Sequence, residues 1–276
     1  MSGSTTNLGS SFTEGSGTVE YDGTVGQTIF NTTYNHLIID QNSTKTASAN
    51  LDVDGNLTID NSAVLSMSGS NYNLDLEGDF TVTSGTYTHG SGSHNIAGNW
   101  DDSGNNGGFT PSAGTVTLSG AGSNITTGSN NNFFNLVINS SGTKSAQSEL
   151  DINGDLTVTD GELAMGANNA DVASGKTVTI ASSKTLSMSS GLFTANGTSD
   201  INGVLSITST GKYDADGDFD ATGGTITFGG AGFLEMSGTT TNLGSSFTEG
   251  SGTVEYDGTS SQTIFNTTYN NLIIDQ

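Results

Sequence analysis

The chain has 276 residues and a formal net charge of −23, which results from 28 acidic residues against five lysines and no arginine. A surface this acidic repels nucleic acid and anionic membranes, so neither is expected as a partner. Cysteine is absent, which excludes a disulfide framework and thiol chemistry. No apolar run approaches the roughly 18 residues of a membrane span, so membrane insertion is not expected.

Short segments in which apolar and polar residues alternate occur along the whole chain, beginning with Gly17–Tyr21 and Gln27–Phe30. A longer motif, apolar-x-apolar-x-Gly-x-apolar-x-apolar, occurs in full or in part at Leu51–Ile59, Leu74–Val82, Ile96–Trp100, Leu150–Val158, Ile201–Ile207 and Tyr213–Ala221. Further alternating segments are Thr115–Leu118, Thr177–Ile180, Lys184–Met188 and Thr225–Phe228. Because a period of two is the period of a β-strand, all are predicted to be strands.

The spacing of the motif indicates how these strands are arranged. Its glycines recur at Gly55, Gly78 and Gly98, and a glycine between two short strands marks a bend or a close backbone approach. One such pair of strands cannot bury its own apolar face, whereas stacked copies build a continuous core. The chain is therefore predicted to be all-β, a parallel β-solenoid (a right-handed β-helix) with roughly 20–24 residues per rung and about twelve rungs. Its stacked columns should bury Leu51, Val53, Leu74, Leu76, Leu150 and Ile152.

A string of immunoglobulin-like sandwiches is the competing fold. The distance from Phe12 to Phe109, which begin similar segments, suits one such domain. Pro111 is the only proline, however, which is few for so many hairpins and linkers. The motif of roughly 20 residues also recurs within each half, which a sandwich does not require.

The chain also repeats on a larger scale. Residues 1–41 return as residues 236–276 with four differences: Ser4/Thr239, Val25/Ser260, Gly26/Ser261 and His36/Asn271. Residues 1–235 are therefore predicted to be one full repeat unit of a continuous solenoid, with related sub-repeats at about 12–108 and 109–235. Residues 236–276 would start the next unit of a longer array.

Several segments resemble known proteins: Gly98-Asn99-Trp100, Phe109-Thr110-Pro111 followed by Gly114–Thr117, and Phe134–Asn139. They are similar to the repeats of very large, repetitive, secreted β-helical adhesin-like surface proteins of bacteria. The resemblance covers most of residues 12–160 and 236–276 and fades across 166–235. It implies an extracellular or cell-surface location and a structural or adhesive role, and it implies no catalytic residues.

The acidic residues supply the candidate metal site. Alternation turns the aspartates of the motif outward, and in-register stacking would set like charges about 5 Å apart, which is unfavourable. Ca²⁺ takes several oxygen ligands and would relieve this repulsion. The densest cluster is predicted as a calcium site and comprises Asp214, Asp216, Asp218 and Asp220. The alternative is a solvated acidic face without metal.

No pattern indicates an enzyme, and no catalytic residue or cofactor-binding residue is predicted. His89 and His94 lie close together in a Gly/Ser-rich stretch, and the favoured interpretation is that both are solvent-facing loop residues. The alternative is that the two side chains bind one metal ion. A glycosidase needs carboxylates at a fixed separation in one groove, whereas the carboxylates here recur with the repeat. The lysines are dispersed along the chain.

The sequence therefore favours a structural segment of an extracellular fibre or filament built from tandem β-solenoid repeats. The expected partners are neighbouring copies of the chain, joined end to end. The alternative is the stalk of a cell-surface adhesin that binds glycans or other cells. Aromatic pairs occur at Phe30/Tyr34, Phe133/Phe134 and Phe265/Tyr269, and stacking in the solenoid core is the favoured interpretation of them. The alternative is that they form sugar-binding platforms.

Overall fold

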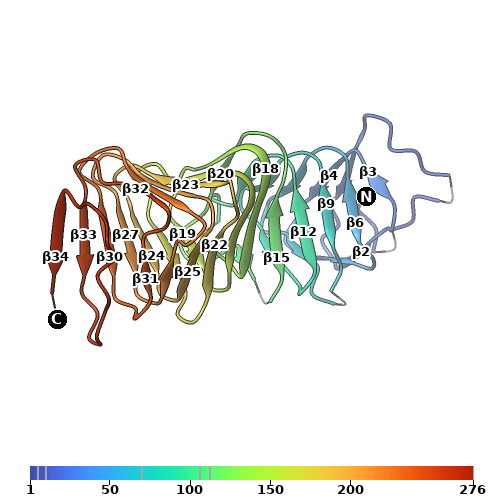
Figure 1. The fold of residues 1–276 in the computed structure, drawn as a ribbon. Coiled ribbons are helices and arrows are strands. Elements are labelled where there is room, and N and C mark those ends of the chain that lie inside the picture. The colour runs from blue at the N-terminus through green and yellow to red at the C-terminus, as the bar shows by residue number, and fades with distance from the viewer. Residues whose placement is uncertain (5, 10, 70, 106, 112, 276) are drawn as a thin grey trace. The chain divides into compact units, whose positions relative to one another are not determined.

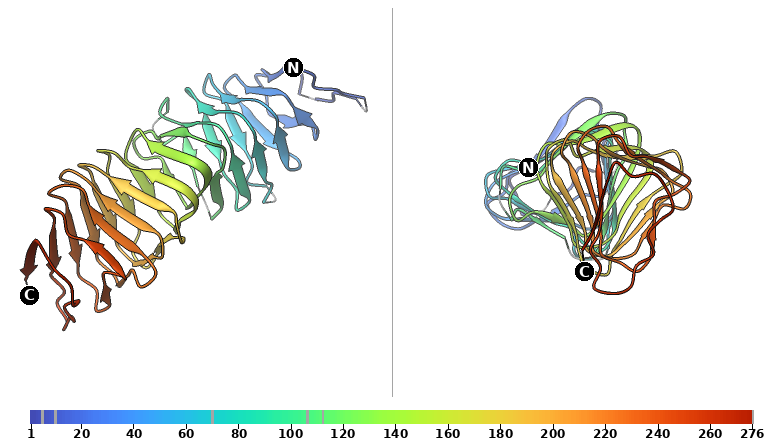
Figure 2. Two further views of the ribbon diagram at one scale, coloured as in Figure 1. Left: turned by 45° about the horizontal axis from the view of Figure 1, so that its top comes forward. Right: turned by 60° about the vertical axis from the view of Figure 1, so that its left-hand side comes forward.

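The computed structural model describes residues 1–276 except 5, 10, 70, 106, 112 and 276. Throughout these residues the regular structure consists of β-strands without helix, stacked in parallel as a β-solenoid of about 13 turns. The chain divides into two compact units, Met1–Phe134 (unit 1) and Asn135–Gln276 (unit 2). Figure 1 shows the strands of each unit stacked one beside the next, and Figure 2 gives two further views of this stacking. No helix in the described part is long and apolar enough to span a membrane.

Three parallel ladders build unit 1. The first consists of β1 (Thr18–Tyr21), β4 (His36–Ile39), β7 (Leu57–Ile59), β10 (Phe80–Val82), β13 (Trp100–Asp101) and β16 (Ser123–Thr126). The second consists of β3 (Thr33–Tyr34), β6 (Leu51–Val53), β9 (Leu74–Leu76), β12 (Ser93–Ile96) and β15 (Thr115–Leu118). The third consists of β2 (Gln27–Ile29), β5 (Thr44–Ala47), β8 (Val64–Ser66), β11 (Thr86–Thr88) and β14 (Phe109–Thr110). A further short strand, β17, spans Asn132–Phe133.

Unit 2 begins with two long strands, β18 (Asn135–Ala146) and β20 (Leu156–Ala164), whose pairing is interrupted by register shifts around Asn139. Two ladders leave β20. One continues through β22 (Thr177–Ile180), β25 (Thr198–Ile201), β28 (Phe219–Asp220) and β31 (Thr241–Asn242). The other continues through β23 (Thr185–Met188), β26 (Val204–Ile207), β29 (Thr225–Phe228) and β32 (Ser246–Thr248). The third ladder consists of β19 (Leu150–Ile152), β21 (Ala170–Val172), β24 (Leu192–Ala195), β27 (Lys212–Ala215), β30 (Phe233–Met236), β33 (Thr253–Tyr256) and β34 (Asn271–Ile274).

The predicted fold class is confirmed, and the sandwich alternative is wrong because the described strand pairs are parallel. Each residue pairs with its equivalent one rung further along the chain, as Leu37 does with Leu57 and Leu51 with Leu74. Alternate side chains point into the solenoid, so the six predicted core residues are at most 2% exposed. The right-handed winding and the repeat boundaries stay predictions.

Glycines mark the corner between two ladders of unit 1, as the motif predicts. Gly55 separates β6 from β7 and Gly78 separates β9 from β10, so these glycines stack from rung to rung. A Cβ at Gly78 would lie 2.5 Å from the carbonyl carbon of Gly55 and nearer still to its oxygen. A Cβ at Gly98 would meet the carbonyl carbon of Gly78 at 2.5 Å. Only glycine allows consecutive rungs to approach this closely at the corner.

We expect Gly78→Ala to destabilise the fold by about 1–3 kcal/mol, because the new methyl group meets backbone atoms that cannot rotate away. Gly69→Ala is the matched control, since no atom lies within 4 Å of a Cβ built there. Urea unfolding of both variants checks the prediction. Equal midpoints for the two variants would contradict a tightly packed corner.

The duplicated segment has different secondary structure in its two positions, although these stretches are identical in sequence. In unit 2, β31 and β32 pair with β28 and β29, whereas the equivalent residues 6–7 and 11–13 of unit 1 form no strand. Conversely, β2 pairs with β5 in unit 1, whereas the equivalent residues 262–264 form no strand. A neighbouring rung therefore decides whether a segment becomes a strand, as expected when each repeat is stabilised by its neighbours.

Candidate functional site

The four aspartates of the predicted calcium site surround one corner of unit 2. Asp214 lies in β27, Asp220 lies in β28, and Asp216 and Asp218 lie in the turn between them, where both are exposed. Asp214 is 3.4 Å from Lys212 Nζ, which also pairs with Glu235 at 2.6 Å. The structure thus places Lys212 between Asp214 and Glu235, and the sequence pattern revealed neither of these partners of Asp214.

Two of these carboxylates already bind backbone or hydroxyl groups of the protein. One oxygen of Asp218 accepts from the backbone N–H of Thr240 at 2.8 Å, and one oxygen of Asp220 accepts from the backbone N–H of Thr222 at 2.9 Å. Among the described residues, no group of three or more histidine or acidic side chains lies close enough to hold a metal ion. The calcium site stays a prediction, which melting curves recorded with and without a chelator would test.

A column of like charges follows the outer face of the ladder β19–β34. The register places five acidic residues at equivalent positions along it, namely Asp151, Asp171, Asp214, Glu235 and Glu255. Partial burial raises the pKa of Asp151, and the adjacent Asp171 raises it further. Burial also raises the pKa of Glu235, which Lys212 opposes. The predicted in-register stacking of carboxylates is therefore confirmed, with Thr194 and Lys212 interrupting the repulsion.

The interpretation of His89 and His94 as solvent-facing loop residues is wrong. Both are buried, at 1% and 0% exposure, and their rings are 3.8 Å apart inside unit 1. His94 lies in β12, two residues before the inward-facing Ile96, and it occupies the same column as Leu74 and Val116. Its position on the inward face follows from the alternation that places Ile96 in the core.

The hydrogen bonds of this pair identify the proton positions. His94 Nε2 lies 3.1 Å from the carbonyl oxygen of Tyr72, which can only accept, so Nε2 carries the proton. In the neutral ring Nδ1 then accepts from the hydroxyl of Tyr87. Burial, together with the neighbouring His89, lowers the pKa of His94 to about 3. Burial likewise lowers the pKa of His89. The pair is therefore a neutral core element at physiological pH.

A buried carboxyl group lies on the inward face beyond β13. Asp102 follows Trp100 by two residues, is fully buried, and accepts from the backbone N–H of Gly128 at 2.9 Å. The side chain of Asn131 donates to the Asp102 carbonyl at 3.0 Å. Burial raises the pKa of Asp102 to about 6, although the Gly128 N–H and the side chains of Asn131 and Trp100 act in the opposite direction.

Two lysines are also buried, which their dispersal along the sequence did not predict. Lys45 and Lys144 are both 0% exposed. Each lies two residues before an inward alanine, at Ala47 and Ala146 respectively, so strict alternation assigns both to the core face. Burial lowers the pKa of Lys144 to about 8 and lowers the pKa of Lys45, which Asp40 and Asp22 oppose.

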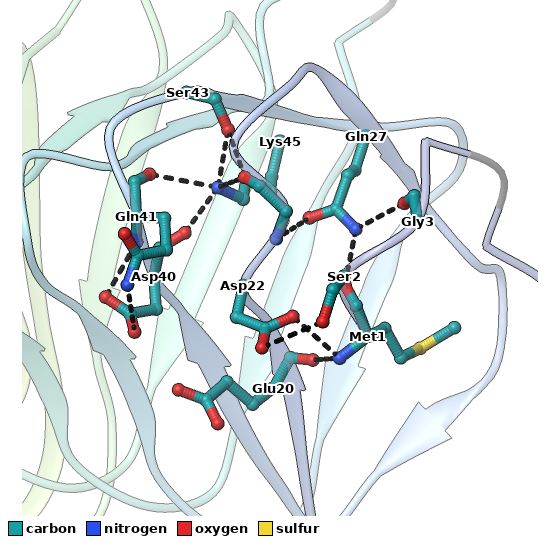
Figure 3. A network of polar contacts seen from close by, with 11 residues as sticks. Met1, Ser2, Gly3, Glu20, Asp22, Gln27, Asp40, Gln41, Ser43 and Lys45 are labelled. Carbon is teal, nitrogen blue, oxygen red and sulfur yellow. Dashed lines mark hydrogen bonds and ion pairs between the residues drawn. The ribbon is translucent and has the colours of Figure 1, made fainter.

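Figure 3 shows how the fold accommodates the Lys45 ammonium group at a corner of unit 1. Lys45 Nζ donates to the carbonyl oxygens of Gly23 and Gln41 at 3.0 Å each, to Ser43 Oγ at 2.7 Å, and to the carbonyl oxygen of Asp40. These carbonyl oxygens thereby gain a hydrogen-bond donor, and the buried ammonium group of Lys45 gains polar partners in place of water.

A second part of this corner is built twice in the chain. In unit 1, Gly23 N–H donates to Gln27 Oε1 at 3.0 Å, and Gln27 Nε2 donates to the carbonyl oxygens of Met1 and Gly3 at 2.6 and 2.8 Å (Figure 3). The equivalent contacts of unit 2 measure 2.9, 2.7 and 2.8 Å and join Gly258, Gln262, Met236 and Gly238. The glutamine therefore joins one rung to the preceding rung in both copies.

A tyrosine pair is duplicated in the same way. Tyr21 and Tyr34 hydroxyls are 2.8 Å apart, and Tyr34 also donates to the carbonyl oxygen of Phe30 at 2.6 Å. The equivalent distances for Tyr256, Tyr269 and Phe265 are 2.9 and 2.6 Å. Tyr34 and Phe133 are fully buried, whereas Phe30, Phe134, Phe265 and Tyr269 are half-buried, so stacking in the core explains only some of the paired aromatics.

Comparison with protein-family models, with curated proteins and with solved structures found no match to this chain.

Proposed function

We propose that this chain is a structural segment of an extracellular or cell-surface fibre built from tandem β-solenoid repeats. The observation that carries the proposal is the duplicated segment, in which the same glutamine and tyrosine contacts form at both places with distances that agree within about 0.2 Å. Because both copies of the segment form the same contacts, the segment suits a protein in which repeat units follow one another in series.

The distribution of polar groups supports a structural role over catalysis. The buried ionisable residues His94, Asp102 and Lys45 are held by backbone carbonyls, backbone N–H groups or neighbouring side chains within the core. The carboxylates on the outer face of the ladder β19–β34 follow the rungs as a periodic column, whereas an active site requires a single convergent arrangement of groups. Neighbouring copies joined end to end are the proposed partners, with no nucleic acid and no inserted membrane.

The proposed location depends on composition and on the resemblance to secreted adhesin-like surface proteins. The excess of acidic residues suits a surface exposed to an ionic medium. Carboxylates stacked along one ladder keep neighbouring fibres apart by repulsion, which a solvated fibre needs if it is not to aggregate laterally.

Electron microscopy of the producing cells with an antibody against residues 42–235 tests the proposal. About 11 turns in each full repeat unit, at ~4.8 Å per turn, predict surface filaments with an axial repeat of about 50 Å. Regular labelling along such filaments is the expected result. Labelling confined to filament tips, together with retention on a glycan array, would favour the adhesin-stalk alternative, and labelling inside the cell would contradict both.

A further inference from the structure

Four asparagines of the chain are followed directly by glycine, namely Asn106, Asn153, Asn196 and Asn202. Glycine has no Cβ to shield its backbone nitrogen, so an asparagine side chain reaches this nitrogen more easily than that of any other residue. Asn106 lies outside the described residues. Each of the other three directly follows a strand of unit 2, at the ends of β19, β24 and β25, so their surroundings can be compared.

A reaction between the asparagine side chain and the glycine nitrogen has three structural requirements. The side-chain amide must be free to turn toward the nitrogen. The N–H of the glycine must not be held as a hydrogen-bond donor, because its proton has to leave. Water must reach the asparagine, since water opens the cyclic product. A fold therefore protects an Asn-Gly pair when hydrogen bonds hold either of the two amides, because these bonds have to break first.

The Asn202-Gly203 pair is protected at both amides. Asn202 Nδ2 donates to Asp200 Oδ1 at 2.6 Å, and the Gly203 N–H donates to the carbonyl oxygen of Ile180 at 2.9 Å. The backbone N–H of Asn202 donates to the same carbonyl oxygen at 2.9 Å. The side chain and the nitrogen that it would attack are thus both engaged.

The Asn196-Gly197 pair is protected at the side chain. Asn196 Nδ2 donates to the carbonyl oxygen of Val172 at 2.8 Å and to Asp171 Oδ2 at 3.1 Å. The backbone N–H of Asn196 donates to the same Val172 oxygen at 3.0 Å. Rotation of the side-chain amide toward the Gly197 nitrogen would therefore break two hydrogen bonds to the preceding rung.

Asn153 meets the requirements that the other two pairs fail. Its side chain is exposed, in the bend between β19 and β20. Among the described residues, neither the Asn153 side-chain amide nor the Gly154 N–H has a hydrogen-bond partner. Gly154 is buried, but the carbonyl carbon that reacts belongs to the exposed Asn153 side chain, which water reaches.

We propose that Asn153 is a site of spontaneous deamidation, with Gly154 as the attacking residue. The Gly154 nitrogen loses its proton and forms a bond to Asn153 Cγ, the bond from Cγ to Nδ2 breaks, and the proton leaves with Nδ2 as ammonia. Water then adds to the resulting succinimide. Cleavage between Cγ and the Gly154 nitrogen gives aspartate, and cleavage between the main-chain carbonyl carbon and this nitrogen gives isoaspartate. Either product adds one negative charge to the chain.

The aspartate product is compatible with the fold. Leu150–Gly154 matches Leu51–Gly55, and the position of Asn153 is held there by Asp54. Asp54 is exposed in the bend between β6 and β7, as Asn153 is between β19 and β20. The chemistry does not depend on the proposed function. In the proposed fibre, one such site in each repeat unit would add negative charge as the fibre ages.

Peptide mapping by mass spectrometry tests the proposal on the full chain, incubated in the folded state at mildly alkaline pH. Asn196 and Asn202 must each break two hydrogen bonds before they react, so we expect Asn153 to deamidate at least about tenfold faster than either. The same incubation in urea is the control. There the three pairs should react at similar rates, because each is an asparagine followed by glycine.

The variant Asn153→Gln gives a second measurement. Glutamine has a longer side chain that would have to close a larger ring, so the earliest acidic species seen by isoelectric focusing of the wild type should be absent. An acidic species that forms equally fast in this variant would overturn the proposal. So would a peptide map of the folded wild type in which Asn153 reacts no faster than Asn202. The map requires no substitution, so it decides the question even if the variant fails to fold.

Discussion

Acidification from pH 6.5 to pH 3 should destabilise the chain by up to about 5 kcal/mol through His94 alone. In the unfolded chain this imidazole titrates near 6.5, whereas in the fold its pKa is about 3. A lowered folded pKa means that the unfolded state binds the proton first. The stabilisation is therefore complete above pH 6.5 and is lost progressively as the pH falls toward 3, at up to about 1.4 kcal/mol per pH unit.

The variant His94→Leu isolates this effect, because Leu74 shows that leucine fits the same column. It should be less stable than the wild type at pH 7, since the Tyr87 hydroxyl loses its acceptor, yet it should lack this part of the acid-dependent loss. Denaturant unfolding at a series of pH values measures the difference. Parallel pH profiles for the wild type and His94→Leu would contradict a neutral buried imidazole.

Asp102 should produce the opposite slope in a neighbouring pH range. Its pKa is raised from 3.8 to about 6, so the folded state holds the proton more tightly than the unfolded state. The stabilisation from this carboxyl group is present below pH 3.8 and is lost as the pH rises toward 6, which amounts to about 3 kcal/mol.

Asp102→Asn is the corresponding variant, because asparagine resembles the protonated carboxyl group and keeps an oxygen for the Gly128 N–H. Its stability relative to the wild type should increase by about 3 kcal/mol between pH 4 and pH 7. Between pH 4 and 6 the effects of His94 and Asp102 on the free energy of unfolding nearly cancel in the wild type. As the pH rises through this range, the stability of His94→Leu should therefore decrease and that of Asp102→Asn should increase. A constant difference between Asp102→Asn and the wild type across this range would contradict the buried, protonated state.

The period of two was sufficient to predict most of the fold. Segments such as Thr115–Leu118 and Thr177–Ile180 form strands with the predicted bounds, because a rung buries one face and exposes the other. The same alternation assigned Leu51 and Ile152 to the core. Where a side chain is small or apolar, the alternation and the physical cost of burial lead to the same prediction.

The two arguments disagree at the polar residues of the core. Lys45, His94 and Asp102 each lie two residues from an inward side chain, so alternation places them inside, whereas charge suggests solvent. The fold resolves the conflict with carbonyl oxygens and N–H groups at its corners. Some are far away in sequence, such as the Tyr72 carbonyl at His94, and others are close, such as the Gln41 carbonyl at Lys45. These partners depend on the exact length of each intervening turn, which a single sequence does not fix.

The candidate metal site was the least predictable feature for the same reason. Spacing alone placed the aspartates at 214 to 220 together, but it did not reveal their partners. Lys212 joins Asp214 to Glu235 of the next rung, and the backbone N–H of Thr240 binds Asp218. Which carboxylate oxygens remain available to a cation depends on those neighbours.

The rung-to-rung hydrogen bonding within each unit has a mechanical consequence. Leu37 and Leu57 face each other although a whole rung separates them along the chain. A load applied across the stacked strands would break the bonds of one edge rung at a time, because no bond of the ladder beyond it needs to yield first. Each released rung adds about 65–70 Å of extended chain. Under tension, such a unit lengthens in successive steps and dissipates work at each one, and it can rewind on the rung that remains.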